Sequence, residues 1–81
     1  MKITPTMLAV LRKIEEHDGE GYVHLVAGVI FPNTRRHMQL RTGQYLGRMC
    51  NRGLLKRYYA DYGGTRYYLT NTAREILKSE W

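Results

Sequence analysis

The sequence predicts one small α+β domain, mainly helical, in which a three-helix core carries a two- or three-stranded β-hairpin and a C-terminal helix. Two observations support this class. Apolar residues recur at helical spacing near both ends and in the middle of the chain, and two short aromatic-rich runs flank a Gly-Gly turn. No internal repeat or Pro- or Ser-rich linker divides the 81 residues, so we expect a single domain over residues 1–81.

The first helix is predicted over residues 5–17. Thr4 is a favourable N-cap, and Pro5 suits the first helical position because the N–H that proline lacks has no partner there. The apolar face follows the helical repeat and consists of Met7, Val10 or Leu11, and Ile14. Gly19 and Gly21 end the helix.

Residues 22–31 allow two interpretations, a short buried helix or a strand, because periodicity does not separate the two over so short an apolar run. We predict a short strand at Tyr22 and Val23, followed by a second helix over residues 24–31. Pro32 then ends this helix.

A third helix is predicted to begin at Thr34 or a nearby residue and to end before Gly53, because glycine supplies the left-handed conformation of a helix end. A loop after Pro32 with a later helix start is the alternative. The core face of this helix consists of Gly43, Leu46, Met49 and Cys50. The opposite side carries Arg41, Gln44, Tyr45 and Arg48.

Two aromatic-rich strands are predicted over residues 54–59 and 66–69. A flexible hairpin tip at residues 61–65 joins them, because Gly-Gly permits positive φ. We expect alternate tyrosines of this hairpin to pack over the core, and stacking on single-stranded bases is the alternative.

The last helix is predicted to begin near Thr70 or Thr72. Thr72 and Glu75 have the spacing of a capping box, in which the two residues satisfy each other's backbone N–H groups. The inner face of this helix contains Ala73, Ile76 and Leu77.

Positive charge is concentrated in residues 35–66. This stretch holds eight Lys or Arg residues against one acid and carries +7, although the whole chain carries a formal +6. Residues 1–34 sum to −1 and residues 67–81 to zero. A segregated positive field is expected when one surface meets a polyanion such as nucleic acid.

Other functional classes find little support in the sequence. No apolar run reaches the ~20 residues of a membrane span, so no membrane association is expected. Cys50 is the only cysteine, which excludes an intrachain disulfide and favours a cytoplasmic location. Neither metal-ligand spacing, a phosphate-binding loop nor a paired set of catalytic side chains is evident. We therefore expect no enzyme activity, metal, cofactor or small-molecule ligand.

Two stretches, residues 46–57 and 63–70, resemble the winged helix-turn-helix domain of bacterial, archaeal and phage transcription regulators. Leu46 and Met49 stand seven and four residues before the Gly-Leu pair that begins at Gly53, and a basic strand follows. A Gly-Gly turn and the sequence Tyr-Tyr-Leu-Thr then lead into the final helix. The likeness covers nearly the whole chain.

The resemblance implies that the third helix enters the major groove of double-stranded DNA while the hairpin, as a wing, meets the adjacent backbone or minor groove. Arginine can form paired hydrogen bonds with guanine, and glutamine with adenine. The base-contacting residues would be Arg41, Gln44, Tyr45 and Arg48. Backbone and wing contacts would come from Arg35, Arg36, Thr42, Arg52, Lys56, Arg57, Gly63, Gly64, Thr65 and Arg66. The competing interpretation is that these side chains form an ordinary solvated face.

The expected function is sequence-specific binding of double-stranded DNA by a small transcriptional regulator, acting as a homodimer on half-sites about one helical turn apart. Two alternatives are a winged-helix protein–protein interaction module and an architectural DNA-binding accessory in phage or plasmid replication, excision or packaging. No effector domain accompanies the predicted fold, so ligand sensing is not expected.

Overall fold

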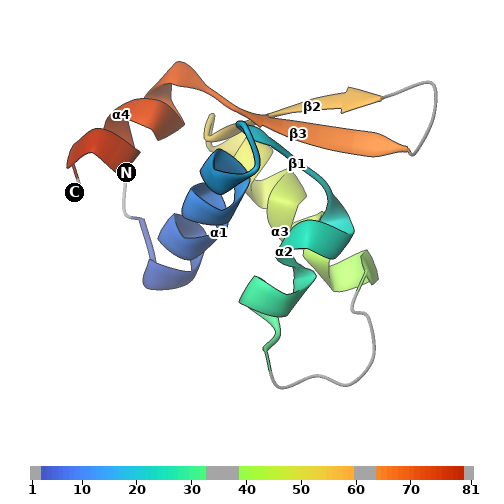
Figure 1. The fold of residues 1–81 in the computed structure, drawn as a ribbon. Coiled ribbons are helices and arrows are strands. Elements are labelled where there is room, and N and C mark those ends of the chain that lie inside the picture. The colour runs from blue at the N-terminus through green and yellow to red at the C-terminus, as the bar shows by residue number, and fades with distance from the viewer. Residues whose placement is uncertain (1–2, 33–38, 60–63, 80–81) are drawn as a thin grey trace.

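The computed structural model describes residues 3–32, 39–59 and 64–79. Within these ranges the chain forms four helices and three strands (Figure 1). In chain order they are α1 (Pro5–Glu16), β1 (Glu20–Gly21), α2 (Val23–Ile30), α3 (Gln39–Asn51), β2 (Leu55–Tyr59), β3 (Thr65–Leu69) and α4 (Asn71–Ser79). The predicted mainly helical α+β class is therefore confirmed.

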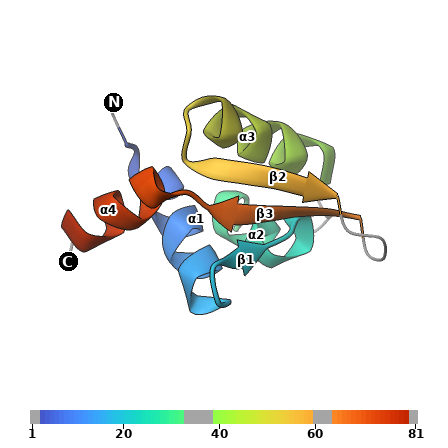
Figure 2. The same ribbon diagram turned by 90° about the horizontal axis from the view of Figure 1, so that it is seen from above.

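The helices pack against one another beneath a small sheet. α1 contacts α2 and α4, and α3 contacts α2 and β2. Figure 1 shows the β2–β3 hairpin extending beyond the helices, with α4 at the opposite end of the molecule. Seen from above, α3 runs alongside β2, whereas β1 lies at the other edge of the sheet (Figure 2). α3 and the hairpin are therefore neighbours that border the same side of the protein.

The sheet is antiparallel with strand order β1-β3-β2. In β3, Tyr67 and Leu69 are buried, whereas Tyr68 between them is half-buried, because successive residues of a strand point to opposite faces. Tyr67 pairs with Gly21 on one side and Arg57 on the other. One sheet face therefore covers the helices, and the outer face is turned away from them.

The position of β1 corrects the strand predicted at Tyr22 and Val23. β1 is Glu20–Gly21, and Tyr22 is instead the extended N-cap residue of α2, which begins at Val23. Gly21 fits against α1 so closely that a Cβ atom there would lie 2.7 Å from a side-chain carbon of Ile14. Glycine at this position therefore permits close packing of the strand against α1 and does not serve as a helix stop alone.

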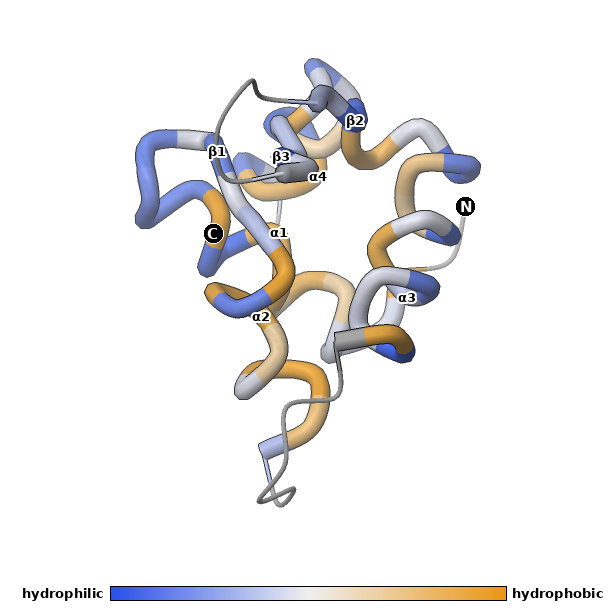
Figure 3. The backbone as a smooth tube through the Cα atoms, turned by 90° about the vertical axis from the view of Figure 1, so that its right-hand side faces the viewer, coloured by the Kyte–Doolittle hydropathy of each residue, from blue (hydrophilic) through white to orange (hydrophobic). Residues whose placement is uncertain are grey.

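The hydrophobic core joins the four described helices to the sheet. Its fully buried large side chains are Val10, Leu11, Ile14, Val26, Leu46, Met49, Leu54 and Leu77. Figure 3 shows apolar residues along most of α2 and a mixture of apolar and polar residues along α3. α3 thus has one face for the core and one for solvent.

The two terminal helices of the described chain begin at threonine caps. Thr4 Oγ1 accepts a hydrogen bond from the Met7 amide at 3.1 Å, which confirms the predicted start of α1. Thr70 Oγ1 accepts from the Ala73 amide at 3.2 Å and lies 2.6 Å from the Gly53 carbonyl oxygen. Thr72 lies inside α4, so the predicted capping box at Thr72 is wrong.

The predicted start of the third helix near Thr34 lies outside the described residues. The described helix begins at Gln39, and Gly53 after its end has a φ of 78°, as predicted. Gly43 and Cys50, predicted on the core face, are only half-buried, so the buried face of α3 is narrower than the sequence indicated.

Candidate nucleic-acid interface

A cationic stripe runs along α3. Its members follow helical spacing and are Arg41, Tyr45 and Arg48 of α3 and Arg52, the first residue after it; we call them the α3 stripe. The three arginines are exposed, whereas the Tyr45 ring is half-buried and packs against the core. At the end of the helix, Arg52 Nη1 lies 3.3 Å from Sδ of Met7. The stripe thus presents guanidinium groups to solvent along the whole described helix.

Gln44 lies beside the α3 stripe and is exposed. It lines a shallow depression of about 220 Å³ together with Phe31, Arg41, Tyr45 and Arg48. The amide of Gln44 can donate and accept hydrogen bonds at once, as adenine recognition requires. Three of the four side chains predicted to contact bases, Arg41, Gln44 and Arg48, are therefore accessible on one side of α3.

The structure contradicts the predicted contact of Thr42 with the DNA backbone. The residue has no exposed surface, because it stands four and seven positions before Leu46 and Met49 and so shares their buried face. Among the residues that the structure describes, its Oγ1 has no hydrogen-bond partner. Thr42 therefore belongs to the core and does not reach a nucleic acid.

A groove of about 390 Å³ separates α3 from the hairpin. We call it the hairpin groove, and its lining residues are Leu40, Gly43, Gln44, Gly47, Arg57, Tyr59, Thr65 and Tyr67. Arg57 crosses it from β2. The Arg57 guanidinium carbon lies 5.8 Å from the centroid of the Tyr67 ring, and a Cβ atom on Gly47 would lie 2.9 Å from Nη2 of Arg57. Gly47 thus leaves room for the Arg57 guanidinium beside α3.

The groups around Arg57 are neutral at pH 7. Burial raises the pKa of the Cys50 thiol, and the nearby Arg57 offsets part of that increase. Burial likewise raises the pKa of the Tyr67 hydroxyl, again with a smaller opposing effect of Arg57. A hydrogen bond to Tyr59 raises the pKa of the Arg57 guanidinium, which therefore keeps its full positive charge beside these neutral side chains.

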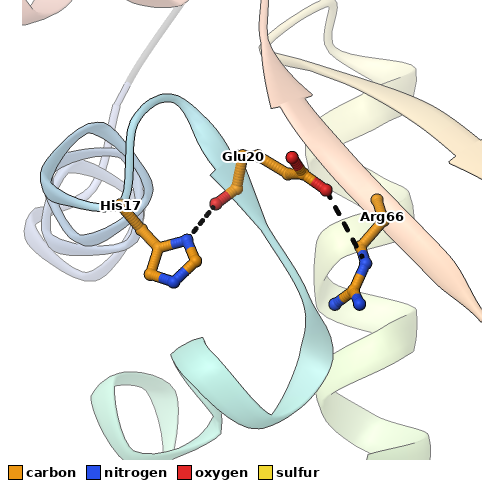
Figure 4. Close-up of polar contacts among 3 residues, drawn as sticks. All are labelled: His17, Glu20 and Arg66. Carbon is orange, nitrogen blue, oxygen red and sulfur yellow. Dashed lines mark hydrogen bonds and ion pairs between the residues drawn. The ribbon is translucent and has the colours of Figure 1, made fainter. Parts of the chain in front are cut away.

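Arg66 lies on the other face of the sheet from Arg57. Its Nε is 3.7 Å from Oε1 of Glu20 (Figure 4). Its guanidinium carbon is 4.8 Å from the ring centroid of Tyr22. His17 supports the same corner, because its Nδ1 lies 3.0 Å from the backbone oxygen of Glu20. The structure therefore brings Arg66 to β1 and does not bring it to the hairpin groove.

The remaining predicted contacts divide among several places. Lys56 is exposed opposite Tyr68, on the same sheet face as Arg66. Gly64 is exposed with a φ of 78°, and Thr65 is half-buried at the rim of the hairpin groove. The other three predicted residues, Arg35, Arg36 and Gly63, lie outside the described part of the chain.

Two groove residues were missed by the sequence analysis. Leu40 and Tyr59 have exposed fractions of 76% and 71%, and both line the hairpin groove. The sequence could have indicated Tyr59, because Tyr59 and Arg57 are two residues apart on a predicted strand. Residues at this spacing share a face of the sheet. Nothing in the sequence distinguished Leu40 from a core residue.

Two other kinds of site were sought in the structure. Residues 3–32, 39–59 and 64–79 contain no group of three or more His, Cys, Asp or Glu side chains that could hold a metal ion. Over the same ranges, every helix is too short or too polar to cross a membrane.

Comparison with known proteins gives a structural match. No protein-family model and no curated protein sequence matches this chain. Among solved structures, the chain is similar to F93 from STIV, described as a winged-helix DNA-binding protein, with a TM-score of 0.71. The match covers 99% of this chain and 87% of F93 at 9% sequence identity. The chain therefore has the winged-helix fold.

Proposed function

We propose that this protein binds double-stranded DNA as a small transcriptional regulator, with α3 in the major groove and the β2–β3 hairpin against the adjacent backbone or minor groove. The observation that carries the proposal is the α3 stripe, in which exposed guanidinium groups follow one side of a helix. F93, to which the fold is similar, is itself described as DNA-binding. The B-DNA major groove, about 12 Å wide, admits an α-helix.

Charge on the two bordering elements supports a polyanionic partner. Residues 39–59 and 64–69 contain six Lys or Arg and no Asp or Glu. The exposed acids of the described chain instead lie on α1, after its end, and on α4. A duplex docked on α3 and the hairpin thus meets cations without a carboxylate from these two segments.

Sequence preference would come from three side chains. Arg41 and Arg48 can each present two N–H groups to O6 and N7 of guanine, and Gln44 can pair with N6 and N7 of adenine. Each well-formed pair contributes about 1–3 kcal/mol of discrimination against the wrong base. So few contacts favour two copies of the chain on two half-sites about one helical turn apart. A protein with this role acts on DNA in the cytoplasm.

The test begins with selection of bound sequences from a random duplex pool of about 20 base pairs, two helical turns. Binding of the selected duplex is then compared between the wild-type protein and Arg48→Ala and Gln44→Ala. The matched control is Lys78→Ala, which removes an exposed charge from α4, at the opposite end from the hairpin. Circular dichroism checks the fold of each variant.

We expect Arg48→Ala and Gln44→Ala each to weaken binding about tenfold or more, the equivalent of ~1.4 kcal/mol, while Lys78→Ala stays within about twofold. No duplex binding by the wild-type protein at low salt contradicts the proposal. Binding that neither α3 substitution changes, in folded proteins, would instead support a protein–protein module or an architectural binder.

A further inference from the structure

The outer face of the sheet combines tyrosine rings with positive charges. Its side chains on β2 and β3 are Lys56, Tyr58, Arg66 and Tyr68, which we call the outer tyrosine surface. We propose that this surface binds single-stranded nucleic acid, with unpaired bases stacked on the tyrosine rings and phosphates held by the two cations. The proposal goes beyond duplex binding, because it concerns another face of the protein and another form of nucleic acid.

The register of the hairpin places each outer tyrosine opposite a cation of the neighbouring strand. Tyr58 of β2 pairs with Arg66 of β3, and Lys56 of β2 pairs with Tyr68 of β3. Residues two apart on a strand share a face, so all four side chains point away from the helices. Figure 2 looks onto the sheet and shows β1, β3 and β2 side by side, with no described helix drawn over them. Rings and positive charges are therefore accessible together.

The two outer tyrosines form an aromatic pair that the rest of the fold covers only in part. Tyr58 has an exposed fraction of 49%, and Tyr68 is half-buried. Their ring centroids are 5.6 Å apart and their planes meet at 61°, an edge-to-face arrangement. Such a pair uses one ring face, so further ring face remains for another aromatic ring. Packing in the core accounts for Tyr67 of the same hairpin, but it does not account for Tyr58 and Tyr68.

The chemistry of this surface matches unpaired bases better than a duplex. In a duplex the base faces are stacked on one another, and a protein reaches only the base edges in the grooves. Unpaired bases expose their faces, and stacking of those faces on aromatic side chains is a main source of affinity for single strands. Cations beside the rings neutralise the phosphates that link successive bases. Tyrosine and cation in alternation therefore supply both interactions that a single strand requires.

One acidic residue belongs to the same sheet face, Glu20 of β1. It pairs with Tyr68 across the strands, and its Oε1 lies 3.7 Å from Nε of Arg66. β2 and β3 themselves contain no Asp or Glu. The carboxylate is thus confined to the β1 edge and offsets part of the Arg66 charge, whereas Lys56 on β2 is exposed. A single strand that follows β2 and β3 therefore meets more positive than negative charge.

The first experiment measures binding of a fluorescein-labelled single strand of about ten thymidines, a length within the usual site size for single strands. Fluorescence anisotropy compares the wild-type protein with Tyr58→Leu, which keeps an apolar side chain without a ring, and with Tyr58→Phe, which keeps the ring. We expect Tyr58→Leu to weaken binding about fivefold or more and Tyr58→Phe to stay within about twofold. A parallel titration with about ten uridines of RNA shows, by the tighter complex, whether the natural strand is DNA or RNA.

The matched control is Tyr59→Leu. Tyr59 is the next residue of β2 and has an exposed fraction of 71%, but it points to the other face of the sheet and lines the hairpin groove. We expect this variant to bind the single strand within about twofold of the wild-type protein. Circular dichroism checks the fold of each variant.

The second experiment uses the wild-type protein alone, so it does not depend on how well a variant folds. One thymidine of the strand is replaced by iododeoxyuridine, which forms a crosslink on irradiation with an aromatic side chain that stacks on it. Mass spectrometry of the digested complex then locates the crosslinked residue. We expect the crosslink at Tyr58 or Tyr68. Crosslinks confined to Tyr59 or to α3 would overturn the proposal.

The outcomes separate this proposal from duplex binding. A wild-type protein that binds the selected duplex but neither single strand overturns the single-strand surface and leaves the proposed function standing. Equal binding of the single strand by the wild-type protein and a folded Tyr58→Leu also overturns it, because charge elsewhere on the protein would then hold the strand. Arg48→Ala, which changes the proposed duplex interface, should bind the single strand within about twofold of the wild-type protein. An equal loss of single-strand and duplex binding by Arg48→Ala would place both on α3 and overturn the outer tyrosine surface.

Discussion

Arg66 Nε lies 3.7 Å from Oε1 of Glu20, across the pairing of β3 with β1, and the same guanidinium stacks over Tyr22. The side chains of Arg66 and Glu20 are 25% and 42% exposed, so solvent screens the pair and its contribution to stability is at most about 1 kcal/mol. A contact this weak can be exchanged for a phosphate. In the proposed complex, Glu20 would therefore compete with the DNA backbone for Arg66.

Glu20→Gln tests this competition. Removing the carboxylate frees Arg66, so we expect duplex affinity to rise by up to about fivefold, the equivalent of ~1 kcal/mol. Glu75→Gln removes the same charge from an exposed site on α4, which lies at the opposite end of the molecule from the β2–β3 hairpin, and serves as the control. Fluorescence anisotropy titrations of the two variants measure the difference. Equal affinities for Glu20→Gln and Glu75→Gln would show that removing the Glu20 carboxylate does not strengthen duplex binding through Arg66.

Thr70→Ala should destabilise the fold more than Thr72→Ala. Thr70 caps α4 through the Ala73 amide, and its hydroxyl lies within hydrogen-bond distance of the carbonyl oxygens of Gly53 and Leu54. Loss of such a cap costs about 1–2 kcal/mol, whereas an exposed helix residue tolerates alanine. Urea unfolding followed by circular dichroism gives both values. A larger loss of unfolding free energy for Thr72→Ala than for Thr70→Ala would support the capping box predicted from the sequence.

Thr42→Val should stabilise the protein. The Thr42 side chain is fully buried, and its hydroxyl has no hydrogen-bond partner within residues 3–32, 39–59 and 64–79, so replacing it by a methyl group of similar shape removes a desolvation cost of about 1–3 kcal/mol. Thr72→Val, at an exposed site on α4, is the control and should change stability by less than about 0.5 kcal/mol. Duplex affinity should not change. A stable fold with weakened binding would place Thr42 at the interface after all.

Local signals predicted the elements of the fold well, and long-range contacts account for the errors. Thr4 and Pro5 specify the start of α1 by themselves. Thr70 and Thr72 offered two starts for α4, and contacts of Thr70 with the carbonyl oxygens of Gly53 and Leu54, distant in sequence, favour Thr70. β1 is two residues long and carries no periodicity, so its position follows from pairing with β3.

The site was predicted in part for the same reason. Helical spacing correctly placed Arg41, Gln44 and Arg48 on the exposed side of α3, because this pattern is local. The same spacing puts Thr42 on the buried face, although its hydroxyl suggested a contact with the DNA backbone. The partner of Arg66 could not be predicted, since Glu20 reaches it only through the pairing of β1 with β3.

Stability should fall in alkaline solution. Burial raises the pKa of Cys50 from its ordinary value of 9.0 and that of Tyr67 from 10.0, so the folded state holds protons that the unfolded state releases. The stabilisation is complete below these ordinary values and is lost as the pH rises through the raised ones. Urea unfolding from about pH 8 to pH 10.5 measures the decline, across the ordinary values of 9.0 and 10.0. Cys50→Ala should have a shallower decline than the wild-type protein near pH 9, and an equal decline would contradict the role of Cys50.

The salt dependence of duplex binding should separate phosphate contacts from base contacts. If each protomer neutralises about five phosphates, log K falls against log salt with a slope near −4 to −5 per protomer. Lys56→Gln, on the exposed face of β2, should weaken binding to all sequences alike and make the slope shallower by about one. Arg48→Ala should change the salt slope less than Lys56→Gln does, because Arg48 is expected to contact a base. It should instead weaken the preference for one sequence over others, which a repeated selection from the random pool measures. A slope near zero for the wild-type protein would mean that the cations of α3 and the hairpin release no counterions. The charge of these two elements would then have no part in binding.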